Sequence, residues 1–223
     1  MAEGRKERRG SYAKGVAKRE EILERALDVI AREGYRGASI KELAEEVGLS
    51  QAGLLHYFDS KEELFTAILR KRDEIDSANF GLADDDGPVE GVDLREGYLG
   101  VIRHNADVPG LVQLFARLSV DASDPDHAAH DFFVARGKTL RTAFAAAIAA
   151  QQAAGELSDR VDPDTLARIF QAVADGLQVQ WMLEPDVDMA GTIDALFTAL
   201  DTRTAAGSDA GTDTEAGRHG AAS

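Results

Sequence analysis

The sequence predicts an all-α protein with a small N-terminal helical domain and a larger C-terminal one. Apolar residues recur at intervals of three and four, and no segment alternates as a β-strand would. Ser, Asp, Gly and Pro stand where helix caps and helix breaks are expected. Positive charge is concentrated at one end: residues 1–72 hold 15 Lys and Arg against 13 Asp and Glu, whereas the remaining residues hold 10 against 27.

Composition limits the class of protein. A chain of 223 residues, of which 44% are hydrophobic, can bury a large core without cross-links. The absence of cysteine excludes disulfides, thiolate metal sites and a cysteine nucleophile. No apolar run reaches the ~18 residues of a membrane span, and the basic start MAEGRKERRG is not followed by the apolar stretch of a signal peptide. We therefore expect a cytoplasmic protein with no membrane partner.

Charge and periodicity divide the chain into four parts. Residues 1–15 are charged and lack an apolar face, which predicts a disordered basic arm. Residues 16–72 form the expected first domain and 73–203 the second, which begins close to an acidic, Gly-Pro-containing interruption at 84–88. The tail 204–223, rich in Ala, Gly, Ser and Thr, is expected to be disordered.

The first domain carries clear start and stop signals for its helices. A helix over 18–33 ends at Gly34, and the capping box SIKE at 39–42 opens a second helix that breaks at Gly48. Ser50 is placed to cap a third, short helix that runs through Phe58. A second capping box, SKEE at 60–63, opens the next helix.

The second domain reads as five longer helices. Asp162 and Pro163 supply a capping side chain and a first-turn proline at the start of one of them. The expected helices cover 93–106, 111–122, 126–154, 163–183 and 188–202.

A helix, a tight turn and a second short helix match the helix-turn-helix, in which the first helix braces the second against the major groove. The segments SIKELAEEVGLS (39–50), QAGLLHYF (51–58) and SKEEL (60–64) together resemble the N-terminal domain of the tetracycline-repressor (TetR) family. The resemblance covers about residues 20–69. It implies a three-helix helix-turn-helix DNA-binding domain followed by a helical ligand-binding and dimerisation domain.

The resemblance implies that the third helix faces a double-stranded DNA operator. Gln51 is the best base reader, because its amide can pair bidentately with adenine. Lys61 would contact backbone phosphate. The residues implied to contact DNA are Ser39, Gln51, Ala52, Gly53, His56, Tyr57 and Lys61.

Several of these positions also have purely structural interpretations. Ser39 would cap its helix in any protein, and Leu54 and Phe58 are better explained as core residues than as DNA contacts. Many family members have tyrosine where this chain has Leu55, so a phosphate contact common in the family is absent from that position. The adjacent aromatic pair His56 and Tyr57 favours a surface role, because a short helix exposes at least one of the two rings.

The second domain resembles the family less closely, although 111–115, 124–127 and 175–181 are similar to one subgroup of its ligand domains. The resemblance implies a homodimer through the last two long helices, 163–183 and 188–202. Gly176 lies inside the first of these helices, where glycine is ~1 kcal/mol less favourable than alanine. Close packing of a helix would explain the glycine, whether that helix belongs to the same subunit or to a partner.

Apolar and aromatic residues at helical spacing, with a few polar groups, are typical of a small-molecule pocket. The effector itself is not specified by the sequence. Candidate ligand-binding residues are Asn105, Phe115, Leu118, Phe144, Phe170, Asp175, Gln178 and Trp181.

Other chemistry finds little support. Gly137-Lys138-Thr139 ends like a P-loop but has Phe132 where that motif needs glycine. His127 and His130 are close in sequence to several aspartates, but a position at the capped start of a helix explains these histidines better than a role as metal ligands. We expect no enzyme, no cofactor and no metal. Two functions remain: a dimeric repressor released from its operator by a small molecule, and a DNA-binding regulator whose second domain serves only dimerisation or contact with another protein.

Overall fold

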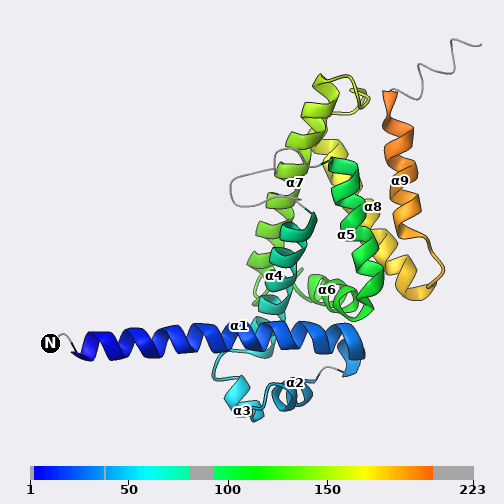
Figure 1. Cartoon of the computed structure of the whole chain (residues 1–223). Coiled ribbons are helices and arrows are strands. Elements are labelled where there is room, and N and C mark those ends of the chain that lie inside the picture. The colour runs from blue at the N-terminus through cyan, green and yellow to red at the C-terminus, as the bar shows by residue number, and fades with distance from the viewer. Residues whose placement is uncertain (1–2, 38, 81–92, 203–223) are drawn as a thin grey trace, which may run out of the picture.

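The computed structural model describes residues 3–37, 39–80 and 93–202. Helix α1 (Glu3–Gly37) lies across one end of the molecule, with α2 (Ile40–Glu46) and α3 (Gln51–Leu54) on its outer side (Figure 1). Helix α4 (Lys61–Phe80) leads from this end into the larger body, which α5 to α9 form. Within the described ranges the fold is all-α, with only an isolated bridge between Leu157 and Asp201.

Helix α1 is longer than the sequence predicted. Its first half extends beyond the other helices (Figure 1). The backbone of residues 3–15 is helical, where composition predicted a disordered arm. Apart from three glycines this stretch is mostly Lys, Arg, Glu and Ala, and extending an existing helix requires no new nucleus. The regular helix ends where predicted, at Gly34, whose φ of 77° departs from helical geometry.

Caps define the short helices. At α2, Ser39 Oγ accepts from the Glu42 amide at 3.2 Å and the Glu42 carboxylate accepts from the Ser39 amide at 2.8 Å, which confirms the predicted capping box. At α4, Ser60 Oγ accepts from the Glu63 amide as predicted, but the Glu63 carboxylate accepts from the amide of Asp59 instead of Ser60.

Helix α3 is shorter than predicted. It ends at Leu54, and Leu55 is its C-cap, because the amide of Tyr57 donates to Leu54 O and closes a turn. Phe58 is therefore in the turn that follows the helix, where it is 1% exposed.

The first core joins the two predicted domains. It contains apolar residues of α1 to α4 together with Leu111, Leu114 and Leu118 of α6 (Pro109–Asp121) and Phe132 of α7 (His130–Ala153). Helix α4 also continues eight residues beyond the predicted boundary at residue 72. The helix-turn-helix thus packs on the same core as the helices of the body.

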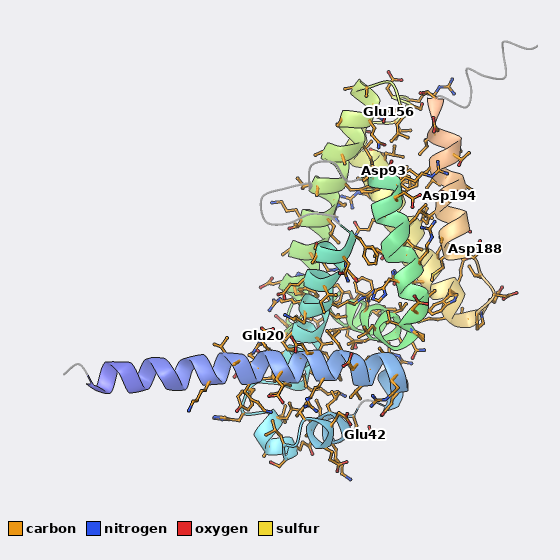
Figure 2. The ribbon with its side chains drawn as sticks, in the orientation of Figure 1. Glu20, Glu42, Asp93, Glu156, Asp188 and Asp194 are labelled. Carbon is orange, nitrogen blue, oxygen red and sulfur yellow. The ribbon has the colours of Figure 1, made fainter. Side chains whose placement is uncertain are left out.

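The second core lies between α5 (Leu94–Asp107), α7, α8 (Pro163–Leu183) and α9 (Met189–Leu200). Asp93, Asp162 and Asp188 cap α5, α8 and α9 by accepting from backbone amides, and Figure 2 labels Asp93 and Asp188 at these helix starts. Burial of their apolar faces against one another holds these helices in place.

In the larger body, the starts of two helices differ from the sequence prediction. Helix α6 begins at Pro109, which occupies the first-turn position that proline tolerates, and not after Gly110. Helix α7 begins at His130 and not at residue 126, because the preceding residues form successive turns. His127 Nδ1 accepts from the Ala129 amide, and His130 Nδ1 lies 2.9 Å from Ala122 O. Both histidines are thus engaged with the backbone of these turns.

The acidic interruption at 84–88 and the tail 204–223 lie outside the described residues. Within the described ranges no helix is long and apolar enough to cross a membrane. The same ranges contain no group of three or more His, Asp or Glu residues placed to hold a metal ion.

Candidate nucleic-acid interface and effector cavity

Helices α2 and α3 form a helix-turn-helix. Gly48 makes the turn with a φ of 70°, a conformation that favours glycine. Ser50 Oγ then accepts from the Gly53 amide at 3.0 Å and fixes the start of α3. Leu43 of α2 and Leu54 of α3 are at most 1% exposed and hold both helices against α1.

The outer side of this unit presents most of the residues implied to contact DNA. Ser39, Gln51, Ala52, His56 and Lys61 are exposed, and Gly53 and Tyr57 are half-buried. The accessible side chains therefore lie at the starts of α2, α3 and α4 and in the turn that follows α3.

Packing separates core from surface here as the sequence interpretation proposed. Leu54 and Phe58 are buried, and Arg19 lies over the Phe58 ring at 4.6 Å while pairing with Glu63 at 3.1 Å. The ring of His56 meets that of Tyr57 edge-on at 5.9 Å, on the surface side of the turn.

A cavity of about 1440 Å³ lies in the body, between α4, α5, α7 and α8, with Phe115 of α6 at one side. Five of the predicted ligand-binding residues line it: Asn105, Phe115, Phe144, Asp175 and Gln178. Three predicted residues do not. Leu118 belongs to the first core, Phe170 packs on Phe197 at 4.5 Å between ring centroids, and Trp181 packs against the second core. Each lies on a helix that lines the cavity or borders it, but on the face turned toward other helices.

The best-formed ion pair of the cavity joins α7 to α4. Arg136 Nε and Nη2 donate to the two carboxylate oxygens of Asp73 at 2.6 and 2.9 Å, and the guanidinium lies 4.9 Å from the Phe115 ring centre. Burial acts to lower the pKa of Arg136, but the charge and hydrogen bonds of Asp73 raise it overall. The bidentate pair fixes the orientation of both side chains.

A second charged cluster joins α4 to α5. Arg72 donates to Asn105 Oδ1, and its Nε lies 3.4 Å from Asp76 Oδ2. Both charged side chains are at most 10% exposed, so burial lowers the pKa of Arg72 and raises that of Asp76. His104 Nε2 lies 3.7 Å from the other Asp76 oxygen.

The aromatic wall centres on Tyr98 of α5. Its ring lies 4.8 Å from that of Phe144, and its hydroxyl donates to Phe170 O at 3.1 Å. Burial, with the negative charge of Asp175 as a smaller cause, raises the pKa of Tyr98. Burial also raises the pKa of the Asp175 carboxyl, against the opposing effect of Arg136.

Sequence reasoning missed most of the charged residues of the cavity, among them Arg72, Asp73, Asp76 and Arg136, and it also missed the aromatic Tyr98. Arg72 and Asp76 are four residues apart in a predicted helix, a spacing that brings opposite charges together, and that spacing was the available signal. Nothing in the local sequence links Asp73 to Arg136, 63 residues away.

The chain is thus a helix-turn-helix protein whose second, helical domain holds a large cavity. A family model described as "Bacterial regulatory proteins, tetR family" matches residues 22–68, and one described as "BetI-type transcriptional repressor, C-terminal" matches 112–205. Together the two matches cover more than half of the chain, which belongs to the TetR family.

Named relatives agree with this assignment. The regulator RutR of Escherichia coli K12 is 39% identical over 72 residues, which are 32% of this chain and 34% of RutR, so that match spans about a third of the relative. The repressor Rv1474c of Mycobacterium tuberculosis is 28% identical over 166 residues, 73% of this chain and 81% of that protein. A solved TetR regulator from Haloarcula marismortui has the same fold, with a TM-score of 0.65, 22% identity and coverage of 83% of this chain and 99% of that one.

Proposed function

We propose that this protein is a dimeric transcriptional repressor of the cytoplasm that binds operator DNA through α3 and leaves it when a small molecule occupies the cavity. The observation that carries the proposal is the course of α4. This helix begins at Lys61, beside the candidate DNA-contacting residues, and carries Arg72, Asp73 and Asp76 on the cavity wall. From Lys61 to Asp76 it spans about 22 Å.

Helix α4 therefore reaches both the candidate DNA-binding surface and the cavity. A ligand that contacts α4 differently in two arrangements of the helices shifts the equilibrium between them. In a dimer this changes the separation of the two recognition helices, which must match major grooves ~34–36 Å apart. Release of DNA by the ligand follows without any contact between ligand and DNA.

The DNA contacts follow from exposure and chemistry. Gln51, at the exposed start of α3, reads a base edge, while Ala52 and Gly53 allow close approach of the backbone. Lys61 and the hydroxyl of Tyr57 contact phosphates and fix the register.

The dimer is proposed to form through α8 and α9. On α8, apolar or small residues at alternating spacings of three and four form a stripe along the surface, in which Gly176 is half-buried and the others are exposed: Ile169, Ala172, Gly176, Val179 and Leu183. Leu183 is 78% exposed and Val179 49%, although both are apolar. Such spacing is that of helix pairs that pack along a seam. Exposed Ala195 and Ala199 on α9 allow a helix to approach closely beside it.

The surroundings of Gly176 favour contact with a partner subunit over packing within one chain. A Cβ atom built at Gly176 meets nothing within 4 Å, so no neighbouring helix of the same subunit requires the glycine. A helix of a second copy, packed across the stripe, accounts for it.

The size and lining of the cavity favour an effector over a purely structural second domain. A purely structural domain gains stability from close packing, which a cavity of about 1440 Å³ with charged walls opposes. A DNA-binding regulator without an effector is therefore the less favoured of the two functions.

A comparison of variants tests the DNA-binding assignment. Fluorescence anisotropy with DNA from upstream of the protein's own gene measures affinity for wild type and for Gln51→Ala. We expect Gln51→Ala to weaken specific binding by ~5–100-fold, because a bidentate base contact contributes ~1–3 kcal/mol. Gln180→Ala, an exposed glutamine of α8, is the matched control. Equal affinities for Gln51→Ala and wild type would contradict the assignment of Gln51.

A further inference from the structure

Leu55 is an apolar side chain exposed within the candidate DNA-binding surface. It is 37% exposed, whereas the neighbouring Leu54 is fully buried. The amide of Leu55 donates to Gln51 O at 3.0 Å, and the backbone of Leu55 keeps helical φ and ψ angles of −70° and −2°. Leu55 therefore lies one helical turn after Gln51, on the same side of α3, because residues four apart in a helix are neighbours.

The position of Leu55 distinguishes it from an ordinary exposed leucine. A single apolar residue on a protein surface needs no partner. Here, however, the exposed neighbours are Gln51 and Ala52 at the start of the helix and His56 in the turn, all of which are candidate DNA contacts. A leucine side chain forms no hydrogen bond with phosphate, so a Leu55 that faces DNA has to contact an apolar group.

The residues around Leu55 favour A·T pairs over G·C pairs. Arginine and lysine are the residues that most often read guanine, and neither occurs between Lys41 and Lys61. Glutamine reads adenine, and thymine, the partner of adenine, carries the C5 methyl group that apolar side chains contact in the major groove. The small residues Ala52 and Gly53 leave room for α3 to approach these base edges closely.

We propose that Leu55 determines operator specificity by packing against a thymine C5 methyl group in the major groove, beside the base pair that Gln51 reads. This inference rests on the proposed function, since it assigns a base contact within the operator. Cytosine or uracil at this position presents hydrogen in place of the methyl group and leaves Leu55 without its apolar contact. The methyl group is thus read by its removal from water and not by a hydrogen bond.

Removal of the methyl group alone tests the proposal, because uracil keeps every hydrogen-bonding group of thymine. Fluorescence anisotropy measures the affinity of the full-length protein for duplexes that carry the operator, mapped by footprinting, with deoxyuridine in place of thymidine at each position of the half-sites in turn. At one position we expect deoxyuridine to weaken wild-type binding by about 4-fold in one half-site and about 15-fold in both, as burial of one methyl-sized group implies.

Variants of Leu55 separate the methyl contact from other effects of uracil on DNA, which are the same for every variant. Leu55→Ala should bind the thymidine and deoxyuridine duplexes equally at that position. Leu55→Met, which keeps an apolar side chain of similar size, should retain the preference for thymidine. Ile75→Ala is the matched control, because Ile75 is 38% exposed but lies on α4 about 21 Å beyond Lys61. It should show the wild-type preference.

Two results would overturn the proposal: wild-type affinity that deoxyuridine changes at no position, or a preference for thymidine that Leu55→Ala retains in full at every position. Circular dichroism and light scattering show whether each variant is folded and dimeric. Wild-type protein that binds no operator contradicts the repressor function and, with it, the role of Leu55. Operator binding that is insensitive to deoxyuridine leaves the repressor function in place and contradicts only the role of Leu55.

Discussion

Gly110 of α6 approaches the backbone of Ile30 in α1 so closely that a side chain does not fit between them. A Cβ atom at position 110 would lie 1.9 Å from the carbonyl oxygen of Ile30 and 2.7 Å from the Cα of Gly34. The start of α6 therefore packs directly on the end of α1, the helix that supports the helix-turn-helix. This contact joins the body to the DNA-binding end of the molecule.

Gly110→Ala should therefore destabilise the protein. Overpacking typically costs ~1–3 kcal/mol, and here the obstacle is backbone, which cannot move aside as a side chain can. Urea denaturation followed by circular dichroism measures the effect. Gly15→Ala is the control, since a Cβ at Gly15 meets nothing within 4 Å and alanine favours the helix. A Gly110→Ala protein as stable as wild type would contradict this packing.

Loss of the Asp73–Arg136 pair should also lower stability. Asp73→Asn removes the charge that holds a largely enclosed guanidinium, and we expect a loss of ~1–3 kcal/mol in the free energy of unfolding. Glu96→Gln breaks the exposed Arg103–Glu96 pair, which is 3.5 Å long, and should change stability by less than ~1 kcal/mol. Similar losses for the two variants in urea denaturation would show that Asp73 has no special role.

The stripe on α8 predicts the oligomeric state. Val179→Asp places a charge in the centre of the proposed dimer interface and should convert the dimer to monomer in size-exclusion chromatography with light scattering. Val120→Asp is the matched control, because Val120 is 70% exposed but lies on α6, outside the stripe. If Val179→Asp remains dimeric, another face forms the dimer.

The cap of α8 predicts a pH dependence. The hydrogen bond to the side chain of Asp162 from the Thr165 amide lowers the pKa of this carboxyl below its ordinary value of 3.8. The folded state therefore holds the proton less tightly than the unfolded state. The stabilisation is complete above the unfolded pKa and disappears as the pH falls through the folded pKa.

Asp162→Asn keeps a capping oxygen that does not titrate. The stability of wild type relative to this variant should be constant near pH 7 and fall below about pH 4, as measured by urea denaturation across pH. A difference that is independent of pH between 2 and 7 would show that Asp162 does not titrate as described.

Local signals in the sequence predicted much of the fold. Gly34 stops α1, Ser39 caps α2 and Asp162 caps α8, because each acts on backbone groups a few residues away. The starts of two helices were predicted less well: α1 begins earlier than composition indicated, and α7 begins only at His130, after a series of turns. The exposed and buried residues of the helix-turn-helix were separated correctly, with Gln51 at the surface and Leu54 in the core.

The cavity was less predictable, since periodicity shows that a residue is apolar but not which neighbour it meets. Phe144 and Phe170 have similar patterns, yet only Phe144 lines the cavity, because Phe170 turns toward Phe197 of α9. The pairing of Asp73 with Arg136 arises from the packing of α4 against α7, which only the three-dimensional structure contains.

Operator binding is tested most directly by a footprint on DNA from upstream of the protein's own gene, made with excess nonspecific DNA and repeated across a salt series. We expect protection of two related half-sites about one helical turn apart, with affinity that falls steeply as salt increases. Protection that competitor DNA abolishes would place the operator elsewhere. Folded, helical protein that protects no DNA at any salt concentration would contradict the proposed repressor function.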